Sequence, residues 1–175
     1  MRPLLILDLD ETLIYASEAP LDRPCDFMVG PFFAYERPGL ANFLAAMREH
    51  FELAVWTSSS APYAALAVAA IFDLPPVFLW ARERCTWRYF PESQGGEWTK
   101  NLSMLKRYGY QLERVLMVDD TPSKLAKHYG NLVRVAPYFG ATDDRELPAL
   151  AAYLPALAAA GNVRRIEKRG WRTSL

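Results

Sequence analysis

The stretch LLILDLDET, residues 4–12, decides the fold class of this 175-residue chain. Four consecutive apolar residues, Leu4–Leu7, are followed at once by two aspartates, Asp8 and Asp10. A short continuous apolar run, without polar alternation, is typical of a strand that is buried on both faces of a parallel sheet. The stretch therefore predicts a buried strand that carries carboxylates at its carboxyl end.

Similar apolar runs recur along the chain and predict further buried strands. They are Leu53–Trp56, Val77–Trp80, Val115–Val118 and Leu132–Val135. Helical patterns lie between or after them, beginning at Pro38, spanning residues 62–72 and 99–108, and beginning again at Thr121 and near Asp143. Strands that alternate with helices predict an α/β fold, here a Rossmann-like open and mainly parallel sheet with helices on both faces.

Two stretches interrupt this alternation and predict small β-hairpin-like insertions, at about residues 15–35 and 82–98. Both are too short for a large cap domain. The second insertion holds Trp87, Tyr89, Phe90 and Trp98, which suit either a substrate platform or a small core of the insertion itself. We expect one domain over residues 1–160 and a basic C-terminal tail over residues 161–175.

Composition excludes several classes of protein. Lys plus Arg and Asp plus Glu both number 20, so no global basic field attracts nucleic acid, and such binding would have to be local, for example at the basic tail. The two cysteines, Cys25 and Cys85, are too few for a disulfide framework. No apolar stretch approaches the length of a membrane span. We expect a cytoplasmic monomer without membrane contact.

Polar residues follow three of the predicted strands at the point where each strand ends. Asp8 and Asp10 follow the first, Thr57 and Ser58 the second, and Asp119 and Asp120 a third, while Lys100 stands before that third strand. In an open parallel sheet, ligands bind at the carboxyl ends of the strands. We therefore expect these side chains to converge at one edge of the sheet.

The chemistry of this set favours phosphoryl transfer. Paired carboxylates form a hard oxygen site that suits Mg²⁺. Thr57 and Ser58 offer hydroxyl and backbone N–H groups for phosphate oxygens, and Lys100 adds a compact positive charge. An aspartate can accept a phosphoryl group, and a second carboxyl two residues later can serve as general acid and base. A phosphoacceptor receiver domain is disfavoured, because its middle strand would have to end in an acceptor aspartate and here Trp56 is followed by Thr57.

These residues also carry a resemblance to a known family. The Asp8–Thr12 segment resembles the DxDxT signature of haloacid dehalogenase (HAD) superfamily phosphatases. Six segments in order resemble, more narrowly, the RNA polymerase II C-terminal-domain phosphatases, including the NLI-interacting-factor-like small phosphatases. The six are DLDETLI (residues 8–14), RPGLANFL (37–44), VWTSS (55–59), RERC (82–85), TKNLSML (99–105) and VDDTP (118–122).

The resemblance implies a role for each position. Asp8 would be the nucleophile that forms an aspartyl phosphate, and Asp10 the general acid and base. Thr57, the Ser58 amide and Lys100 would bind the phosphate. Mg²⁺ would be held by Asp8, by the backbone carbonyl of Asp10 and by the Asp119–Asp120 pair. The family often has Asp-Asn at that pair, and its pattern favours Asp120 as the ligand and Asp119 as the partner of Lys100.

The resemblance implies the reaction rather than the substrate, for which our leading expectation is phosphoserine or phosphothreonine in a protein. A phosphatase of a small metabolite or of a nucleic-acid end is the alternative enzyme. A catalytically inactive protein-binding scaffold is the alternative of another class, although relatives of that kind usually lack the nucleophile or the acid, and both are present here.

Overall fold

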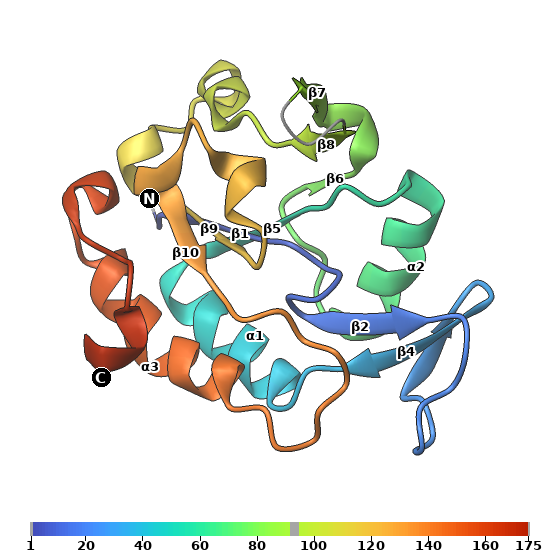
Figure 1. The fold of residues 1–175 in the computed structure, drawn as a ribbon. Coiled ribbons are helices and arrows are strands. Elements are labelled where there is room, and N and C mark those ends of the chain that lie inside the picture. Colours follow the sequence, from blue (N-terminus) through green and yellow to red (C-terminus); the bar gives the residue numbers. More distant parts are fainter. Residues whose placement is uncertain (1, 92–94, 175) are drawn as a thin grey trace.

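A five-stranded parallel sheet forms the centre of the protein (Figure 1), in a computed structural model that describes residues 2–91 and 95–174. The strand order is β10-β9-β1-β5-β6. The bounds are β1 Leu4–Leu7, β5 Glu52–Trp56, β6 Leu79–Trp80, β9 Val115–Asp119 and β10 Leu132–Arg134. The predicted α/β fold with a mainly parallel sheet is confirmed, and the strand predicted at Val77–Trp80 is shorter than expected.

Successive residues of each strand face opposite sides, so that the sheet has two apolar faces. Leu5 and Leu7 pack in the cluster that contains α1 (Leu40–His50), α2 (Ala61–Ile71) and α3 (Glu146–Ala158). Leu4 and Ile6 pack on the other side against residues of short 3₁₀ helices. Those helices are Leu102–Tyr108, Leu112–Arg114 and Pro122–Leu125. Burial on both faces explains why the strands are continuously apolar.

Some helices differ in type or bounds from the prediction. Residues 99–101 are not helical, and the rest of the expected helix, Leu102–Tyr108, is a 3₁₀ helix, as is the segment after Thr121. The last α-helix begins at Glu146 rather than near Asp143. Segments of four to seven residues make too few i→i+4 hydrogen bonds to offset helix nucleation, so the tighter 3₁₀ form is used. Further 3₁₀ turns are Arg82–Arg84, Tyr129–Asn131, Val163–Arg165 and Trp171–Ser174.

The two predicted insertions are small β units. The first is a three-stranded antiparallel sheet, β2 (Ile14–Ser17), β4 (Phe32–Glu36) and β3 (Phe27–Val29), and is thus one strand larger than a hairpin. The second is the hairpin β7 (Thr86–Phe90) and β8 (Gly95–Thr99). Residues 92–94 and the Phe90 side chain lie outside the described part of the chain.

Aromatic residues of the second insertion contact one another across the hairpin and also keep exposed surface, while a role as a substrate platform stays a prediction. Trp87 and Trp98 are cross-strand partners whose rings meet edge to face, 5.1 Å apart at their centroids. This contact is what a small core within the insertion would provide. Trp87 and Tyr89 nonetheless remain 53% and 59% exposed, so both rings keep a surface that faces solvent.

The C-terminal segment folds back onto the domain. Val163 and Trp171 are buried in the same cluster as α1 and α3. The Trp171 ring stacks on Tyr153 of α3, and its Nε1 donates a hydrogen bond to the Arg134 carbonyl of β10 at 2.7 Å. Leu175 lies outside the described residues. Among the described residues, no helix has the length and apolarity needed to cross a bilayer.

Candidate active site

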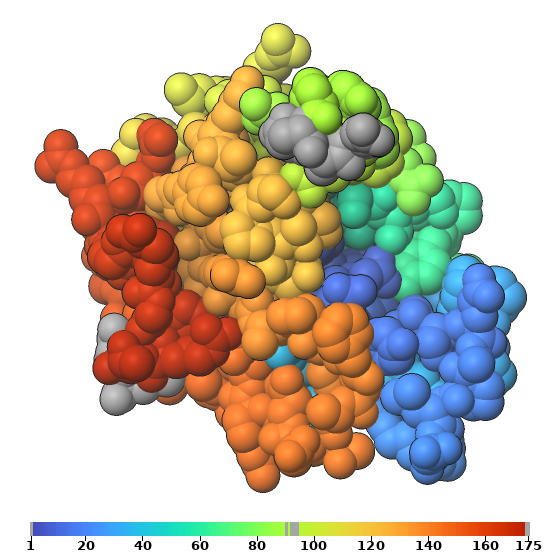
Figure 2. Space-filling view, viewed as in Figure 1, coloured from blue at the N-terminus to red at the C-terminus, as the bar shows by residue number. Residues whose placement is uncertain are grey.

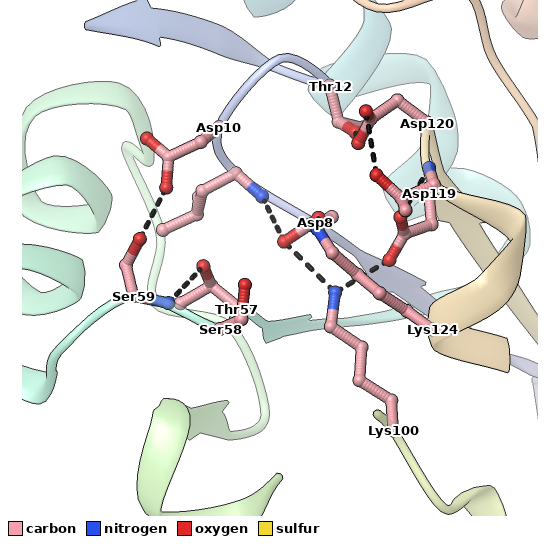
Figure 3. Close-up of polar contacts among 12 residues, drawn as sticks. Asp8, Asp10, Thr12, Thr57, Ser58, Ser59, Lys100, Asp119, Asp120 and Lys124 are labelled. Atoms are coloured by element: carbon pink, nitrogen blue, oxygen red, sulfur yellow. Dashed lines mark hydrogen bonds and ion pairs between the residues drawn. The ribbon is translucent and has the colours of Figure 1, made fainter. Parts of the chain in front are cut away.

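The sheet topology brings the predicted polar residues together. β1 lies between β5 and β9 and is parallel to both, so the three carboxyl ends are adjacent. Figure 3 shows Asp8 at the centre, Thr57 and Ser58 on one side, and Asp119 and Asp120 on the other. The loop after β1 is shaped by Glu11, whose φ of 60° is left-handed and carries backbone strain. Tyr138 N–H donates to the Glu11 carbonyl at 2.8 Å and helps to hold this turn.

Lys100 is the buried centre of charge at the site. Its ammonium lies 3.1 Å from Asp8 Oδ1 and 2.6 Å from Asp119 Oδ2, and its side chain has no exposed surface. Asp8 is 1% exposed and also accepts a hydrogen bond from the Leu9 amide at 2.9 Å. The Lys100 backbone N–H donates to the Lys124 carbonyl, which ties the two lysines together. The pairing of Lys100 with Asp119 that the family pattern favoured is present.

Lys124 is a second cation at the site, and sequence reasoning missed it. Its Nζ lies 3.3 Å from Asp8 Oδ2, on the opposite carboxylate oxygen from Lys100. Burial by itself would lower the pKa of Lys124, but the carboxylates of Asp8, Asp119 and Asp120 outweigh it and raise that pKa. In the sequence, a lysine two residues after Thr121-Pro122 indicates a site residue only if that turn is known to lie at the edge of the sheet that carries Asp8.

The two lysines set the charge state of the carboxylates. Burial would raise the pKa of Asp8, but the ammonium groups of Lys100 and Lys124 outweigh burial, so the pKa lies below its ordinary value. Burial raises the pKa of Asp119 to about 6, because desolvation outweighs the favourable contact with Lys100. Asp8 is thus the more firmly ionised of the two, which is the state a nucleophile needs.

Three buried carboxylates form a cluster that fits a divalent cation. Asp8, Asp119 and Asp120 each offer an oxygen, and these oxygens lie within 4.8 Å of one another. Thr12 Oγ1 and Thr121 Oγ1 donate to Asp120 at 3.4 and 2.9 Å and orient it. Three carboxylates face two ammonium groups, so one negative charge is left over when all are ionised. An oxygen set with excess negative charge suits Mg²⁺.

The Asp10 carboxyl lies apart from that cluster. In Figure 3 it is directed toward Ser59 rather than toward Asp8. Ser59 Oγ donates to Asp10 Oδ2 at 2.6 Å, and the Tyr63 hydroxyl of α2 donates to Oδ1. Burial is the main cause that raises the pKa of Asp10 above its ordinary value, and the two hydrogen bonds oppose it. The assignment of the Asp10 backbone carbonyl to a metal stays a prediction.

Thr57 and Ser58 lie where β5 ends. Thr57 is buried, and its Oγ1 accepts the Ser59 N–H at 3.1 Å. The Ser58 carbonyl accepts a hydrogen bond from Arg82 Nε at 2.8 Å, which fixes this turn against the second insertion. Helix α2 begins at Ala61, three residues after Ser58, so its N-terminal N–H groups lie next to this turn. The turn thus joins hydroxyl and amide donors at the edge that carries Asp8.

Arg37 is a buried residue that supports the site, and the sequence pattern singled it out only within the RPGLANFL segment. Its side chain is fully buried and donates to the Thr12 carbonyl at 3.1 Å and the Ala136 carbonyl at 2.9 Å. It also forms a bidentate pair with Asp144, at 2.9 and 2.8 Å. These contacts join the loop after β1 to the segment after β10, and so hold the turn that carries Asp10 and Thr12.

Comparison with protein families identifies a match over nearly the whole chain. The family model described as NLI interacting factor-like phosphatase matches residues 3–164. The chain is 34% identical over 171 residues to the "Probable C-terminal domain small phosphatase" of Dictyostelium discoideum, with 91% of this chain and 52% of that protein covered. It is 33% identical over 169 residues to the human "Carboxy-terminal domain RNA polymerase II polypeptide A small phosphatase 1", with 91% and 60% covered. The chain therefore spans less than two thirds of either relative.

Solved structures share the fold. The structure of Fcp1, described as an essential RNA polymerase II CTD phosphatase, aligns with a TM-score of 0.58 at 20% identity. The alignment covers 99% of this chain and 48% of Fcp1. An uncharacterised protein from Listeria monocytogenes aligns with the same TM-score at 16% identity, covering 89% of this chain and 98% of that one. At such identities the likeness shows the fold alone.

Proposed function

This chain belongs to the NLI interacting factor-like phosphatase family, and from that membership we propose that it hydrolyses phosphate monoesters on serine or threonine side chains of a protein. The observation that carries the proposal is the Asp8 carboxylate, held ionised between Lys100 and Lys124 at the carboxyl end of β1. The relatives named above are described as phosphatases, and the human one is named for the RNA polymerase II C-terminal domain.

Asp8 acts as the nucleophile in this proposal. A carboxylate oxygen of Asp8 forms a bond to phosphorus while the bond between phosphorus and the ester oxygen breaks. Lys100 and Lys124 neutralise charge on the phosphoryl oxygens, and the donors at Thr57 and Ser58 orient them. Lys124 is the more exposed of the two lysines, with 18% of its side chain accessible against none for Lys100, so it is the one able to turn from Asp8 toward an incoming phosphate.

Asp10 moves the protons in both steps. It gives a proton to the departing serine or threonine oxygen, which leaves as the alcohol. It then takes a proton from water as the water oxygen attacks phosphorus, and the bond from phosphorus to Asp8 breaks to release inorganic phosphate. The raised pKa of Asp10 favours its protonated form before the first step.

Asp8, Asp119 and Asp120 would hold Mg²⁺ through their clustered oxygens. When bound, Mg²⁺ supplies positive charge that offsets the negative charge gathering on the transferring phosphoryl group. Asp119 and Asp120 both place a carboxylate oxygen in the cluster, so distance does not decide which of them binds the metal directly. Lys100, however, already contacts Asp119 Oδ2. Asp120, whose partners are the Thr12 and Thr121 hydroxyl groups, is therefore our proposed ligand.

The test is phosphate release from two substrates, a phosphoserine peptide and an aryl phosphate. We expect Mg²⁺-dependent hydrolysis of both, with the higher kcat/KM for the peptide, because groups remote from phosphorus contribute binding energy in the transition state. Removal of Mg²⁺ by a chelator should abolish both activities. Hydrolysis of the aryl phosphate alone would contradict the protein substrate and favour a metabolite or a nucleic-acid end. Hydrolysis of neither would favour an inactive binding scaffold.

Tyr63→Phe should slow turnover of alkyl phosphates more than of aryl phosphates. Tyr63 donates to Asp10, so its loss removes one of the two hydrogen bonds that hold the general acid. A serine oxygen must be protonated in order to leave, whereas the phenoxide of a phenol with a low pKa leaves without a proton. We expect kcat for the phosphoserine peptide to fall about tenfold, within the usual contribution of acid catalysis, and kcat for the aryl phosphate to stay nearly constant.

Tyr153→Phe is the matched control, since Tyr153 lies on α3 against Trp171 and should give the parent rates for both substrates. Phe at position 63 keeps the ring that meets Phe32 edge to face, so the packing between α2 and β4 is retained. Equal losses on the two substrates would contradict a role through Asp10 and indicate a general structural effect instead.

A further inference from the structure

A basic groove borders the C-terminal segment, and the proposed activity does not use it. The groove has a volume of about 990 Å³ and lies between the residues that follow β10 and the segment from Arg164 to Arg172. In Figure 2 this C-terminal segment, in red, lies against the orange surface of the chain that follows β10. Its lining carries six cationic side chains, Arg134, Arg164, Arg165, Lys168, Arg169 and Arg172, and one acidic side chain, Glu167. The charge is local, because the whole chain has equal numbers of acidic and basic residues.

Half of these cations lack a carboxylate partner among the described residues. Arg169 pairs with Glu167 at 2.7 Å, Arg172 pairs with Glu146, and Arg164 approaches Glu113 at 4.0 Å. In the part of the chain that the structure describes, no carboxylate lies within 4.0 Å of the charged groups of the other three, Arg134, Arg165 and Lys168. Among the described residues, these three cations of the groove are therefore without a salt bridge.

Lys168 is the most unusual of these groups, because it is 5% exposed. Its ammonium donates to the carbonyl oxygens of Val163 at 2.6 Å and Ile166 at 2.8 Å. An ammonium has three N–H donors, and these two carbonyls account for two of them. A buried cation without a carboxylate is costly unless an anion completes its surroundings.

Neighbouring guanidinium groups add to the positive field. Burial lowers the pKa of Arg172, and repulsion from Arg37 and Arg134 lowers it further. Asp144 opposes this repulsion, and a bound anion would relieve it further. Ile166, which is partly exposed, adds an apolar side chain to the lining of the groove.

The groove begins next to the catalytic edge. Pro122, which lines it, is the second residue after Asp120. Val135, also in its lining, donates its backbone N–H to the Asp119 carbonyl at 3.2 Å. The groove thus borders the carboxyl ends of β9 and β10, at the edge of the sheet that carries Asp8.

We propose that this groove binds an acidic segment of the protein substrate, close in sequence to the phosphorylated residue. The inference rests on the proposed phosphatase activity toward a protein, and it adds a second recognition site to it. Carboxylate side chains pair with the exposed Arg134 and Arg165, and the pairing raises the local concentration of the phosphoryl group at Asp8.

Nucleic acid fits the groove less well than a peptide. Proteins that bind single strands stack successive bases on exposed aromatic rings. Among the described lining residues, Trp171 is 1% exposed, and Tyr129, at 58%, is the single aromatic ring with a large free surface. A peptide needs no such platform, so a protein segment is the occupant that the lining favours.

The test compares two phosphoserine peptides of equal length. One carries a run of Asp and Glu joined to the phosphoserine by a Gly-Ser spacer, and the other has Asn and Gln in place of those acids. We expect roughly tenfold higher kcat/KM for the acidic peptide, with an optimum at one spacer length. Arg134→Glu/Arg165→Glu should remove this advantage, and added salt should reduce it. These arginines have exposed side chains, so the double variant is expected to fold.

Lys106→Glu/Arg107→Glu is the matched control, since both side chains are exposed on the 3₁₀ helix Leu102–Tyr108 and lie outside the groove lining. It should keep the preference for the acidic peptide. Aryl phosphate turnover should be the same in the parent and in both double variants. Equal kcat/KM for the two peptides, in an enzyme that hydrolyses both, would overturn the groove proposal and leave the proposed function intact.

Fluorescence anisotropy with an unphosphorylated acidic peptide tests the groove independently of catalysis. We expect this labelled peptide to bind the parent and the Lys106/Arg107 control, and to bind the Arg134/Arg165 variant about tenfold more weakly. Tighter binding of a single-stranded oligonucleotide of equal charge, lost in the same variant, would overturn the peptide as occupant. If the parent protein binds this acidic peptide but hydrolyses neither phosphoserine peptide, the result would count against the proposed function alone.

Discussion

Asp8→Asn should lower kcat by about 10⁴-fold or more on both the phosphoserine peptide and the aryl phosphate. The carboxamide of asparagine has nearly the shape of the carboxylate, but it is a far weaker nucleophile toward phosphorus. The loss should be equal for the two substrates, because the first chemical step is the same whatever alcohol leaves. Single-turnover phosphate release measures it directly.

The same variant should remain folded in the absence of metal. Asp8, Asp119 and Asp120 together face Lys100 and Lys124, so neutralising one carboxylate balances the buried charges. We expect a modest fall in melting temperature, because the lowered pKa of Asp8 means that the fold stabilises its ionised form. Asp26→Asn is the control, since Asp26 is a partly exposed partner of Arg23 in the first insertion and should leave kcat unchanged. Turnover by Asp8→Asn above about one per cent of the parent rate would contradict the nucleophile assignment.

Lys100→Met should lower kcat/KM by about 10²- to 10³-fold and also destabilise the protein. Methionine fills a similar volume without charge, so the Asp8 and Asp119 carboxylates lose the ammonium that lies between them. Removing one partner of a buried ion pair costs about 3–5 kcal/mol of unfolding free energy, which lowers the melting temperature by roughly 10 °C in a chain of this length. Thermal melting of metal-free protein at pH 7 measures this second effect.

The stability of Lys100→Met should recover as the pH falls. The pKa of Asp119 is already raised to about 6, so the folded protein binds this proton more tightly than the unfolded chain does. The stability gained from that proton is largest at low pH and is lost as the pH rises through the folded pKa. Without Lys100 the pKa of Asp119 should rise further. The difference in melting temperature between variant and parent should therefore shrink from pH 8 to pH 5.

Lys124→Met removes the second cation of the site, and its comparison with Lys100→Met shows how much the burial of the lost charge matters. The Lys124 side chain is 18% exposed and contacts the other oxygen of Asp8. We expect a smaller loss of stability than for Lys100→Met, since water can replace part of the lost contact. Equal losses of stability in the two variants would contradict the assignment of Lys100 as the buried centre of charge.

The sequence predicted the sheet because burial on both faces leaves a direct mark on each strand. Leu4–Leu7 and Val115–Val118 are apolar at every position, and only a strand covered on both sides needs that pattern. The type of the covering helices was not predicted. The Leu102–Tyr108 segment has helical apolar spacing, but 3₁₀ and α geometry share similar spacing over so few residues.

The convergence of Asp8, Thr57 and Asp119 was predictable for the same reason. Each follows a buried strand, and the carboxyl ends of parallel strands meet at one edge of a sheet. The partners of these residues were not predictable. Lys124 contacts Asp8 from 116 positions away, and Tyr63 contacts Asp10 from 53 positions away. No local pattern marks such pairs, because they depend on where a 3₁₀ turn and a helix begin in space.

In the C-terminal segment, too, some features were predictable from the sequence and others were not. Its basic composition and its apolar residues Val163 and Trp171 are visible in the sequence, which thereby determined that the segment is cationic and able to dock. Only the tertiary structure decided that Lys168 is buried, with carbonyl oxygens of Val163 and Ile166 as its hydrogen-bond partners, and that Arg134 of β10 joins the same groove. Sequence patterns determine which residues need burial and which carry chemistry, because these are local properties. Distances between remote charges are set by packing, and the tertiary structure alone decides them.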